Sequence, residues 1–504
     1  MLKEKILETE AEFLIYVEDI MKYNEAINVL TWDLRTKAPK KGVEQRSKVI
    51  GMLSSNCFKM STSKKMSIFI ETLTSPKAKN YISNITKKML EECKRKYELN
   101  KKIPSQEYKE YVILTSKAES KWEIAKERSD FSILVPYLEK IVNFNKRFVD
   151  YWGYTENKYN TLLDIYEPGL TVKSLDDIFN RLRNAVVPLV KEIGKSKRKV
   201  DYSLLFASLS LAQQKEFIGL ILQEFCYNFD AGRLDQTAHP FTLDMNLDDV
   251  RVTTKYIEND FRASIFSAIH ECGHALYEQN ISKKLSKTNL RAEASMGIHE
   301  SQAIFLEKIV GKSFSFWERN YKKMIEHSGD YLNTVSLEEF FFAINQPKPS
   351  SIRLEADELT YPLHIMIRYE IEKDLINGSI NVKDLPSIWN DKYQKYLGVS
   401  PKDDAEGILQ DVHWAVGLFG YFPSYGLGYI YAAQFKNAAM KDLPDFDDLI
   451  KNGQFNRILD WLIYNIYRYG KTKKPLELLH DVTGEGINPQ YLIEYLVNKY
   501  KHFL

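Results

Sequence analysis

Cysteine is scarce in this sequence. The 504 residues contain four, Cys57, Cys93, Cys226 and Cys272, which lie far apart and form neither a CxxC pair nor the dense spacing of a disulfide-rich secreted domain. This usage favours a reducing compartment. The N-terminal segment MLKEKILETEAEF mixes acidic and basic residues and lacks the apolar core of a secretory signal. We therefore expect a cytoplasmic protein.

The sequence also lacks an excess of charge of one sign. Lys and Arg total 70 against 68 Asp and Glu, a net charge of +2, so no overall field recruits nucleic acid or an acidic membrane surface. Two basic clusters, KRKYELNKK at 94–102 and KSKRK at 195–199, are interpreted as solvated surface, with a nucleic-acid-binding module as the rival hypothesis. No apolar run reaches about 18 residues, so no membrane span is expected.

Strand-like alternation is rare, and helical spacing dominates. Apolar residues recur every three to four positions after Asp130, a candidate N-cap, until Gly153, which predicts one long amphipathic helix. Similar patterns cover 105–127 and 488–500. Only DVRVTTKY, residues 249–256, alternates like a strand. The sequence therefore predicts a mainly α fold with one small sheet, placed just before the segment described next.

The segment AIHECGHALYEQN, residues 268–280, contains the pattern HExxH. It continues a predicted helix that begins after Asp260 and buries a stripe including Cys272. His270 and His274 lie four residues apart on one helix face, so both imidazoles can reach one metal ion. Glu271 lies beside that ion, where a base for a metal-bound water is needed. Random placement gives this pattern in about 1% of such chains, and two histidines with a purely structural role are the alternative.

Zinc needs a third protein ligand and an open position for water. Glu278 continues the same helix face but lies about 12 Å from His270 along the axis, which is too far. A second predicted helix, IHESQAIFLEKIVG, ends at Gly311 and contains Glu300. Spacing favours Glu300 only slightly over Glu293 and Glu307. His299 is interpreted as a supporting or structural residue. A closed site with four protein ligands would instead indicate a purely structural metal.

Several motifs in order resemble those of the M32 metallocarboxypeptidases, the thermostable carboxypeptidase Taq type. HECGH and HESQ correspond to the HExxH and HES/GQ pair of that family. Three further signatures follow its DxRxT, IRxxAD and GxxQDxHW motifs, namely DVRVT at 249–253, IRLEAD at 352–357 and GILQDVHW at 407–414. Weaker similarities near Trp32 and Tyr425 extend the resemblance over nearly the whole chain. One departure is TLDMNLD after His239-Pro240-Phe241, which lacks the glycines expected there.

The resemblance implies His270, His274 and Glu300 as metal ligands and Glu271 as the catalytic base. It implies one catalytic unit over residues 1–504, a large helical body with a deep groove similar to the neurolysin and angiotensin-converting enzyme folds. Two helical subdomains flanking the groove are one arrangement of such a unit. The protein would be a homodimer that removes single residues from peptide C-termini with broad specificity, and C-terminal proline would be a poor substrate.

Peptide hydrolysis by such a site needs further groups. A divalent metal, one per subunit, polarises the carbonyl; zinc is expected, while cobalt or manganese fit the same ligands. His413 and Tyr425 are the neutral donors available to the developing oxyanion. The resemblance also suggests Arg353 as the group that binds the terminal carboxylate, and an ion pair of Arg353 with Glu355 or Asp357 is the structural alternative.

Arg251 is a further substrate-binding candidate. Asp249 is close enough in sequence to hold its side chain on the same strand face, and the strand itself could pair with an extended peptide. The expected partners are peptides with a free C-terminus, with neither nucleic acid nor a membrane involved. The alternative function is an oligopeptidase or dipeptidyl carboxypeptidase of similar helical fold, which product masses would distinguish.

Overall fold

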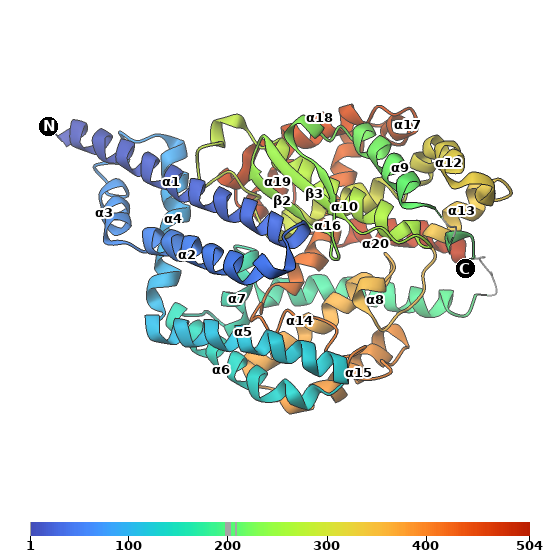
Figure 1. Ribbon diagram of the computed structural model, residues 1–504, viewed down its shortest axis with the longest axis horizontal. Helices are drawn as coiled ribbons and strands as arrows, with labels where there is room; N and C mark the ends of the chain where they lie inside the picture. The colour runs from blue at the N-terminus through green and yellow to red at the C-terminus, as the bar shows by residue number, and fades with distance from the viewer. Residues whose placement is uncertain (1, 197–202, 207–208) are drawn as a thin grey trace.

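The computed structural model describes residues 2–196, 203–206 and 209–504 (Figure 1). These residues are mainly helical, with one small sheet immediately before the helix that carries HExxH, as the sequence predicts. Residues 197–199 of the basic cluster at 195–199 lie outside the described residues. The cluster at 94–102 lies in a helix, and most of its basic side chains are exposed, which agrees with a solvated surface.

In chain order the α-helices are α1 (Leu2–Thr36), α2 (Val43–Ser61), α3 (Lys64–Leu73), α4 (Asn84–Lys102), α5 (Ser105–Arg128), α6 (Val135–Trp152), α7 (Lys158–Tyr166), α8 (Val172–Ile193), α9 (Leu211–Glu224), α10 (Phe261–Gln279), α11 (Met296–Ile304), α12 (Phe314–Ser328), α13 (Leu337–Ile344), α14 (Tyr361–Asn377), α15 (Leu385–Leu397), α16 (Phe422–Asp442), α17 (Phe446–Lys451), α18 (Phe455–Asn465), α19 (Pro475–Thr483) and α20 (Gln490–Tyr500). None of the described helices is long and apolar enough to cross a membrane.

The amphipathic segment after Asp130 differs from the prediction at its start. Asp130 accepts a hydrogen bond from the backbone N–H of Ser132 and caps a short 3-10 turn, and α6 begins only at Val135 with Pro136 in its first turn. Proline fits there because the first turn needs no N–H donor. The predicted end is confirmed, since Gly153 adopts φ 85°, a conformation that glycine adopts without strain.

The sheet contains β1 (Leu234–Gln236), β2 (Thr242–Asn246) and β3 (Asp249–Thr254) in the order β1-β3-β2. The strand predicted within 249–256 is therefore confirmed as β3, and the glycine-poor segment TLDMNLD forms β2 and its turn. Because β3 pairs with β1 on one side and β2 on the other, both of its edges are used. The expectation that β3 could pair with a peptide substrate is wrong; only β1 and β2 are edge strands.

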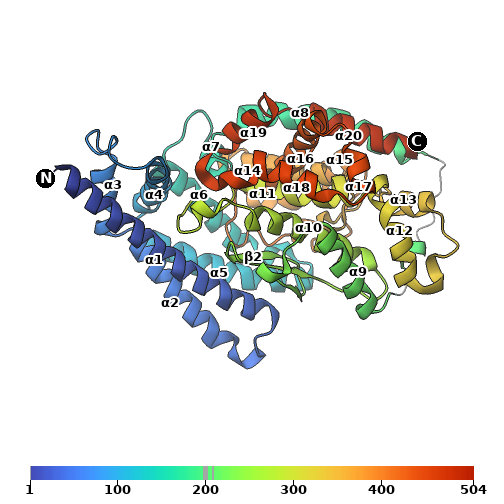
Figure 2. The ribbon, with the colours of Figure 1, turned by 90° about the horizontal axis from the view of Figure 1, so that it is seen from above.

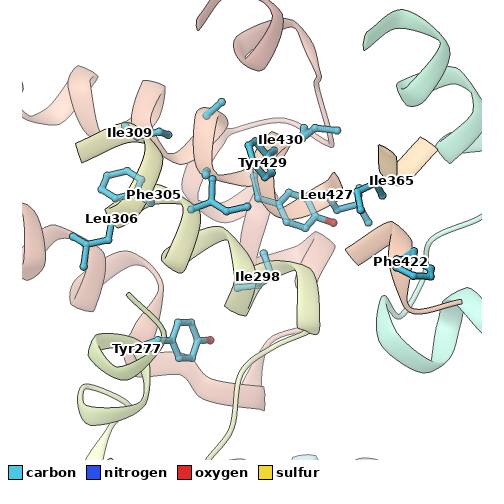
Figure 3. Close-up of a cluster of buried hydrophobic side chains, with 14 of the residues drawn as sticks. Tyr277, Ile298, Phe305, Leu306, Ile309, Ile365, Phe422, Leu427, Tyr429 and Ile430 are labelled. Carbon is cyan, nitrogen blue, oxygen red and sulfur yellow. The ribbon is translucent and has the colours of Figure 1, made fainter. Parts of the chain in front are cut away.

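The sheet, α10, α11 and α16 are packed one against the next. In Figure 2, α10 lies between the strands and α16, and in Figures 1 and 2 α1 with α2 projects from one end of the molecule. Figure 3 shows the apolar contact that joins these helices, where Ile298 of α11 and Leu427 of α16 belong to one buried cluster, both fully excluded from solvent. Burial of this kind stabilises by about 25 cal/mol per Å² of apolar surface, so the relative position of α10, α11 and α16 is fixed by the core.

Candidate metal centre

Helix α10 forms because its sequence supplies both a cap and a buried stripe. The carboxylate of Asp260 accepts a hydrogen bond from the backbone N–H of Arg262, which satisfies one of the free donors at the helix start. Phe261, Ile265 and Cys272 are fully buried. The prediction that Cys272 is a core residue is thus confirmed, and the two histidines project from a different face.

Two glycines allow the helices that carry His270, His274 and Glu300 to approach closely. A Cβ on Gly273 of α10 would lie 2.5 Å from the carbonyl oxygen of Gln302 and 2.6 Å from Cα of Ala303, both backbone atoms of α11. A Cβ on Gly428 of α16 would lie 2.7 Å from Cγ of Glu300. Neither position has room for a side chain. The two glycines therefore set the distance at which Glu300 faces the histidines.

His270, His274 and Glu300 converge on one point. Nε2 of His270 lies 3.8 Å from Oε2 of Glu300, and Nε2 of His274 lies 3.5 Å from the same oxygen. Two ligand atoms at about 2.05 Å from zinc are about 3.3 Å apart in a tetrahedral site, so the spacing fits one ion with little adjustment. No fourth His, Cys, Asp or Glu within the described ranges joins this group. The arrangement is that of an open site.

Glu307 does not join the three ligands but orients one of them. Its Oε2 lies 3.0 Å from Nδ1 of His270, the nitrogen that faces away from Glu300, and Glu307 also contacts Lys308. Burial alone would lower the pKa of His270, but the carboxylates of Glu300 and Glu307 outweigh it and raise this pKa to about 9. A carboxylate on the second nitrogen fixes the orientation of a metal-binding imidazole.

Glu271 lies beside the candidate ligands, and its carboxylate is held by the sheet. Oγ1 of Thr242, on β2, donates to Oε2 of Glu271 at 2.7 Å and lies 2.9 Å from the backbone oxygen of the same residue. Burial raises the pKa of Glu271 to about 7, against the opposing effect of His270 and Thr242. A carboxyl with such a pKa can exchange protons near neutral pH. The position of Glu271 beside His270 follows from the sequence, its role as the base stays a prediction, and the contact with Thr242 was missed.

His299 contacts the back of the metal centre. Its ring lies 4.2 Å from that of His274, centroid to centroid, and its Nε2 lies 3.3 Å from Oε1 of Glu278. It is not among the three converging ligands. Burial lowers the pKa of His299 to about 4, so its imidazole is neutral.

Arg353 has a different partner from the one considered in the sequence. Its Nη2 lies 2.8 Å from Oδ1 of Asp411, whose Oδ2 binds Arg368, so the alternative of an ion pair with Glu355 or Asp357 is wrong. The two guanidinium groups share one carboxylate, and the side chain of Arg353 is only 8% exposed. Nη1 of Arg353 also donates to the hydroxyl of Tyr361. One positive charge of this group is uncompensated.

His413 and Tyr425 lie next to this group of charges. The guanidinium of Arg353 lies 5.3 Å from the ring centre of Tyr425, and the rings of Tyr425 and His413 are 6.2 Å apart. Burial lowers the pKa of His413 to about 4, and its Nδ1 is buried without a hydrogen-bond partner. Burial, neighbouring phenols and Glu300 raise the pKa of Tyr425 well above its ordinary value. Both side chains are therefore neutral near pH 7.

Arg251 is not brought together with these residues. Thr254 of β3 donates to the backbone of Ser264 on α10, and side chains alternate along a strand, so Arg251 projects from the opposite face. There it binds Asp249 through two hydrogen bonds of 2.7 and 2.6 Å and lies 5.6 Å from the ring centre of Trp32. The predicted contact with Asp249 is confirmed. This ion pair gives both charged residues of the DVRVT motif a structural role.

Comparison with known proteins places the chain in a family. The family model described as carboxypeptidase Taq (M32) metallopeptidase matches residues 12–500. Carboxypeptidase 1 of Bacillus subtilis is 54% identical over 98% of both chains. Thermostable carboxypeptidase 1 of Thermus thermophilus is 38% identical over 93% of this chain and 94% of its own. The crystal structure of an M32 carboxypeptidase from Deinococcus radiodurans R1 has a TM-score of 0.95 at 29% identity, covering 98% of this chain and 99% of that chain.

These comparisons agree with the motifs and with the geometry of the site. The family model covers almost the whole chain, one relative is more than half identical, and the solved structure has the same fold as this chain. The family is that of metallopeptidases, which implies a divalent metal ion and peptide substrates. This chain belongs to the carboxypeptidase Taq (M32) family and is a metallocarboxypeptidase.

Proposed function

We propose that this protein removes single amino acids from the C-termini of peptides, with His270, His274 and Glu300 as ligands of one zinc ion and Glu271 as the catalytic base. The observation that carries the proposal is the convergence of the three ligand atoms, which all lie within 4.8 Å of one another. A set of two imidazoles and one carboxylate suits zinc, and cobalt or manganese fit as well. The side chain of His270 is 23% exposed, which leaves the centre open to solvent and substrate.

When bound, the metal supplies Lewis acidity that polarises the scissile carbonyl and lowers the pKa of water. Glu271 accepts a proton from the attacking water and delivers it to the nitrogen of the leaving amino acid. Thr242 holds the carboxylate in place for both transfers through its 2.7 Å hydrogen bond. Glu307 keeps His270 in one orientation through Nδ1. The sheet and the π-helical segment Phe305–Val310 thus position the site from two sides.

Recognition of the terminal carboxylate is assigned to Arg353. Its planar guanidinium can bind a carboxylate with two parallel hydrogen bonds, and the shared Asp411 leaves one positive charge in the Arg353, Arg368 and Asp411 group. Because this group is buried, the remaining charge attracts a carboxylate more strongly than a surface arginine does. His413 and Tyr425 are the neutral groups that can donate to the oxyanion as it forms.

The finer points of the proposal rest on the family resemblance and the sequence. They are broad specificity with poor acceptance of C-terminal proline, a homodimer, and a cytoplasmic location that agrees with four unpaired cysteines. Residues 1–504 form one catalytic unit, which the match of one family model to residues 12–500 supports, and two helical subdomains flanking a groove are one arrangement of that unit. Arg251 is assigned a structural role through Asp249.

The test compares two peptides that differ only at the C-terminus, one with a free carboxylate and one amidated. The zinc-loaded protein should shorten the free peptide by one residue at a time and leave the amide intact. Arg353→Ala should lose most of its preference for the free carboxylate, while Arg457→Ala, which removes a half-exposed arginine, should behave like the wild type. Equal cleavage of both peptides by the wild-type protein would refute the assignment of Arg353.

A further inference from the structure

A second cluster of metal-binding side chains lies behind the first. Glu278, at the end of α10, Glu293, in the loop that follows, and His299, on α11, have ligand atoms within 4.8 Å of one another. His299 links the two groups, because its ring lies 4.2 Å from that of His274. The two groups share no ligand. The second cluster is therefore a separate site and not part of a bridged pair.

The cluster contains a buried polar atom without a hydrogen-bond partner. The side chain of Glu278 is 6% exposed, and its Oε1 lies 3.3 Å from Nε2 of His299. That nitrogen is buried and has no hydrogen-bond partner among the described residues. A buried polar atom without a hydrogen-bond partner is costly, and such atoms in native proteins are satisfied by a bound ion or by water.

Carboxyl groups outnumber cationic side chains around the cluster. Asp244, Glu278 and Glu293 lie together here, and Arg291 is beside them, its Nη2 lying 3.5 Å from Oδ2 of Asp244. Lys471 is also near, and it lies 3.5 Å from Glu92, which contacts Arg95 and Lys96 as well. Burial and the neighbouring Asp244 raise the pKa of Glu278 well above its ordinary value. Negative charge is therefore unfavourable at this position, and a bound divalent cation would offset it.

We propose that Glu278, Glu293 and His299 bind a second divalent cation of the manganese or zinc class. Two carboxylate oxygens and one imidazole nitrogen are donors that both metals accept, whereas magnesium and calcium favour oxygen ligands alone. The cation ties the end of α10 to the start of α11 and fixes the ring of His299 against His274. It binds more weakly than the first, because the two cations repel each other and Arg291 is close.

Manganese binding to the zinc-loaded protein tests this site. Protein carrying one zinc per chain, freed of excess metal, is titrated with Mn²⁺ while the electron paramagnetic resonance signal of free Mn²⁺ is followed. The wild type should bind about one Mn²⁺ per chain and keep its zinc. Glu278→Gln should weaken Mn²⁺ binding by about tenfold or more, since one of three ligands loses its charge. Glu127→Gln, a change at an exposed position, should bind like the wild type.

Three results would overturn the second site: no Mn²⁺ bound by the wild type at millimolar concentration, equal binding by the wild type and Glu278→Gln, or Mn²⁺ uptake matched by an equal loss of zinc. If Glu278→Gln does not fold, as judged by circular dichroism, Glu293→Gln gives the same readout from a side chain that is only half-buried. Peptidase activity is not the readout, so this site and the proposed function can fail independently.

Discussion

Replacing Glu307 with glutamine should weaken zinc binding without removing a zinc ligand. The change keeps an oxygen that can accept from His270 but removes the negative charge that now lies 3.0 Å from Nδ1. A hydrogen bond to a charged group contributes about 1.5 to 3 kcal/mol. At 1.4 kcal/mol per factor of ten, this corresponds to a zinc dissociation constant about 10 to 150 times larger. Losses of about 10 to 100 times are typical for carboxylates that support a metal-binding histidine.

The measurement is a competition titration of zinc between the protein and a chelator of known affinity. Because Glu307 also contacts Lys308, Glu307→Gln leaves an unpaired lysine and will lower stability as well. Lys308→Gln is the matched control, since it removes the same ion pair but leaves Glu307 against His270. A zinc affinity for Glu307→Gln equal to that of Lys308→Gln would show that the contact with His270 contributes nothing.

Two further predictions concern stability and helix spacing. Burial raises the pKa of Glu372 from 4.5 to about 7, so the contribution of this carboxyl group to stability is fully present below pH 4.5 and is lost as the pH rises through 7. The free energy of unfolding of the wild type, measured in urea relative to Glu372→Gln, should therefore fall by roughly 2 to 3 kcal/mol between pH 5 and pH 8. A difference between the two proteins that stays constant over this pH range would contradict this prediction. Gly273→Ala should lower stability by about 1 to 3 kcal/mol and weaken zinc binding, because its Cβ would lie 2.6 Å from Cα of Ala303; unchanged unfolding and zinc titrations would contradict it.

The sequence predicted the relative position of the two histidines on one helix better than the contacts between distant segments. HECGH fixes the relative position of His270 and His274 because four residues make about one helical turn. Glu300 and Glu307 are seven residues apart, about two turns, so both lie on one face of a regular helix and spacing favoured Glu300 only slightly. In the structure the helix changes to a π-helix from Phe305, which shifts Glu307 out of regular phase and onto Nδ1 of His270.

Contacts between residues far apart in the sequence depend on tertiary packing, which a local sequence pattern does not predict. Arg353 pairs with Asp411, 58 positions away, whereas the sequence suggested its neighbours Glu355 and Asp357. Thr242 reaches Glu271 only because β2 lies along α10. The role of β3 as the central strand follows from the pairing of β1, a strand too short to be recognised by alternation.

The central claim is that HECGH is a catalytic metal helix, with Glu271 as the base. The most direct test is mass spectrometry of a peptide with a blocked N-terminus, incubated with the zinc-loaded wild type and with Glu271→Gln, the zinc content of both being measured. The account predicts a ladder that loses one C-terminal residue at a time with the wild type, and an intact peptide with a variant that retains its zinc. Internal fragments, or a ladder of equal rate from Glu271→Gln, would contradict it.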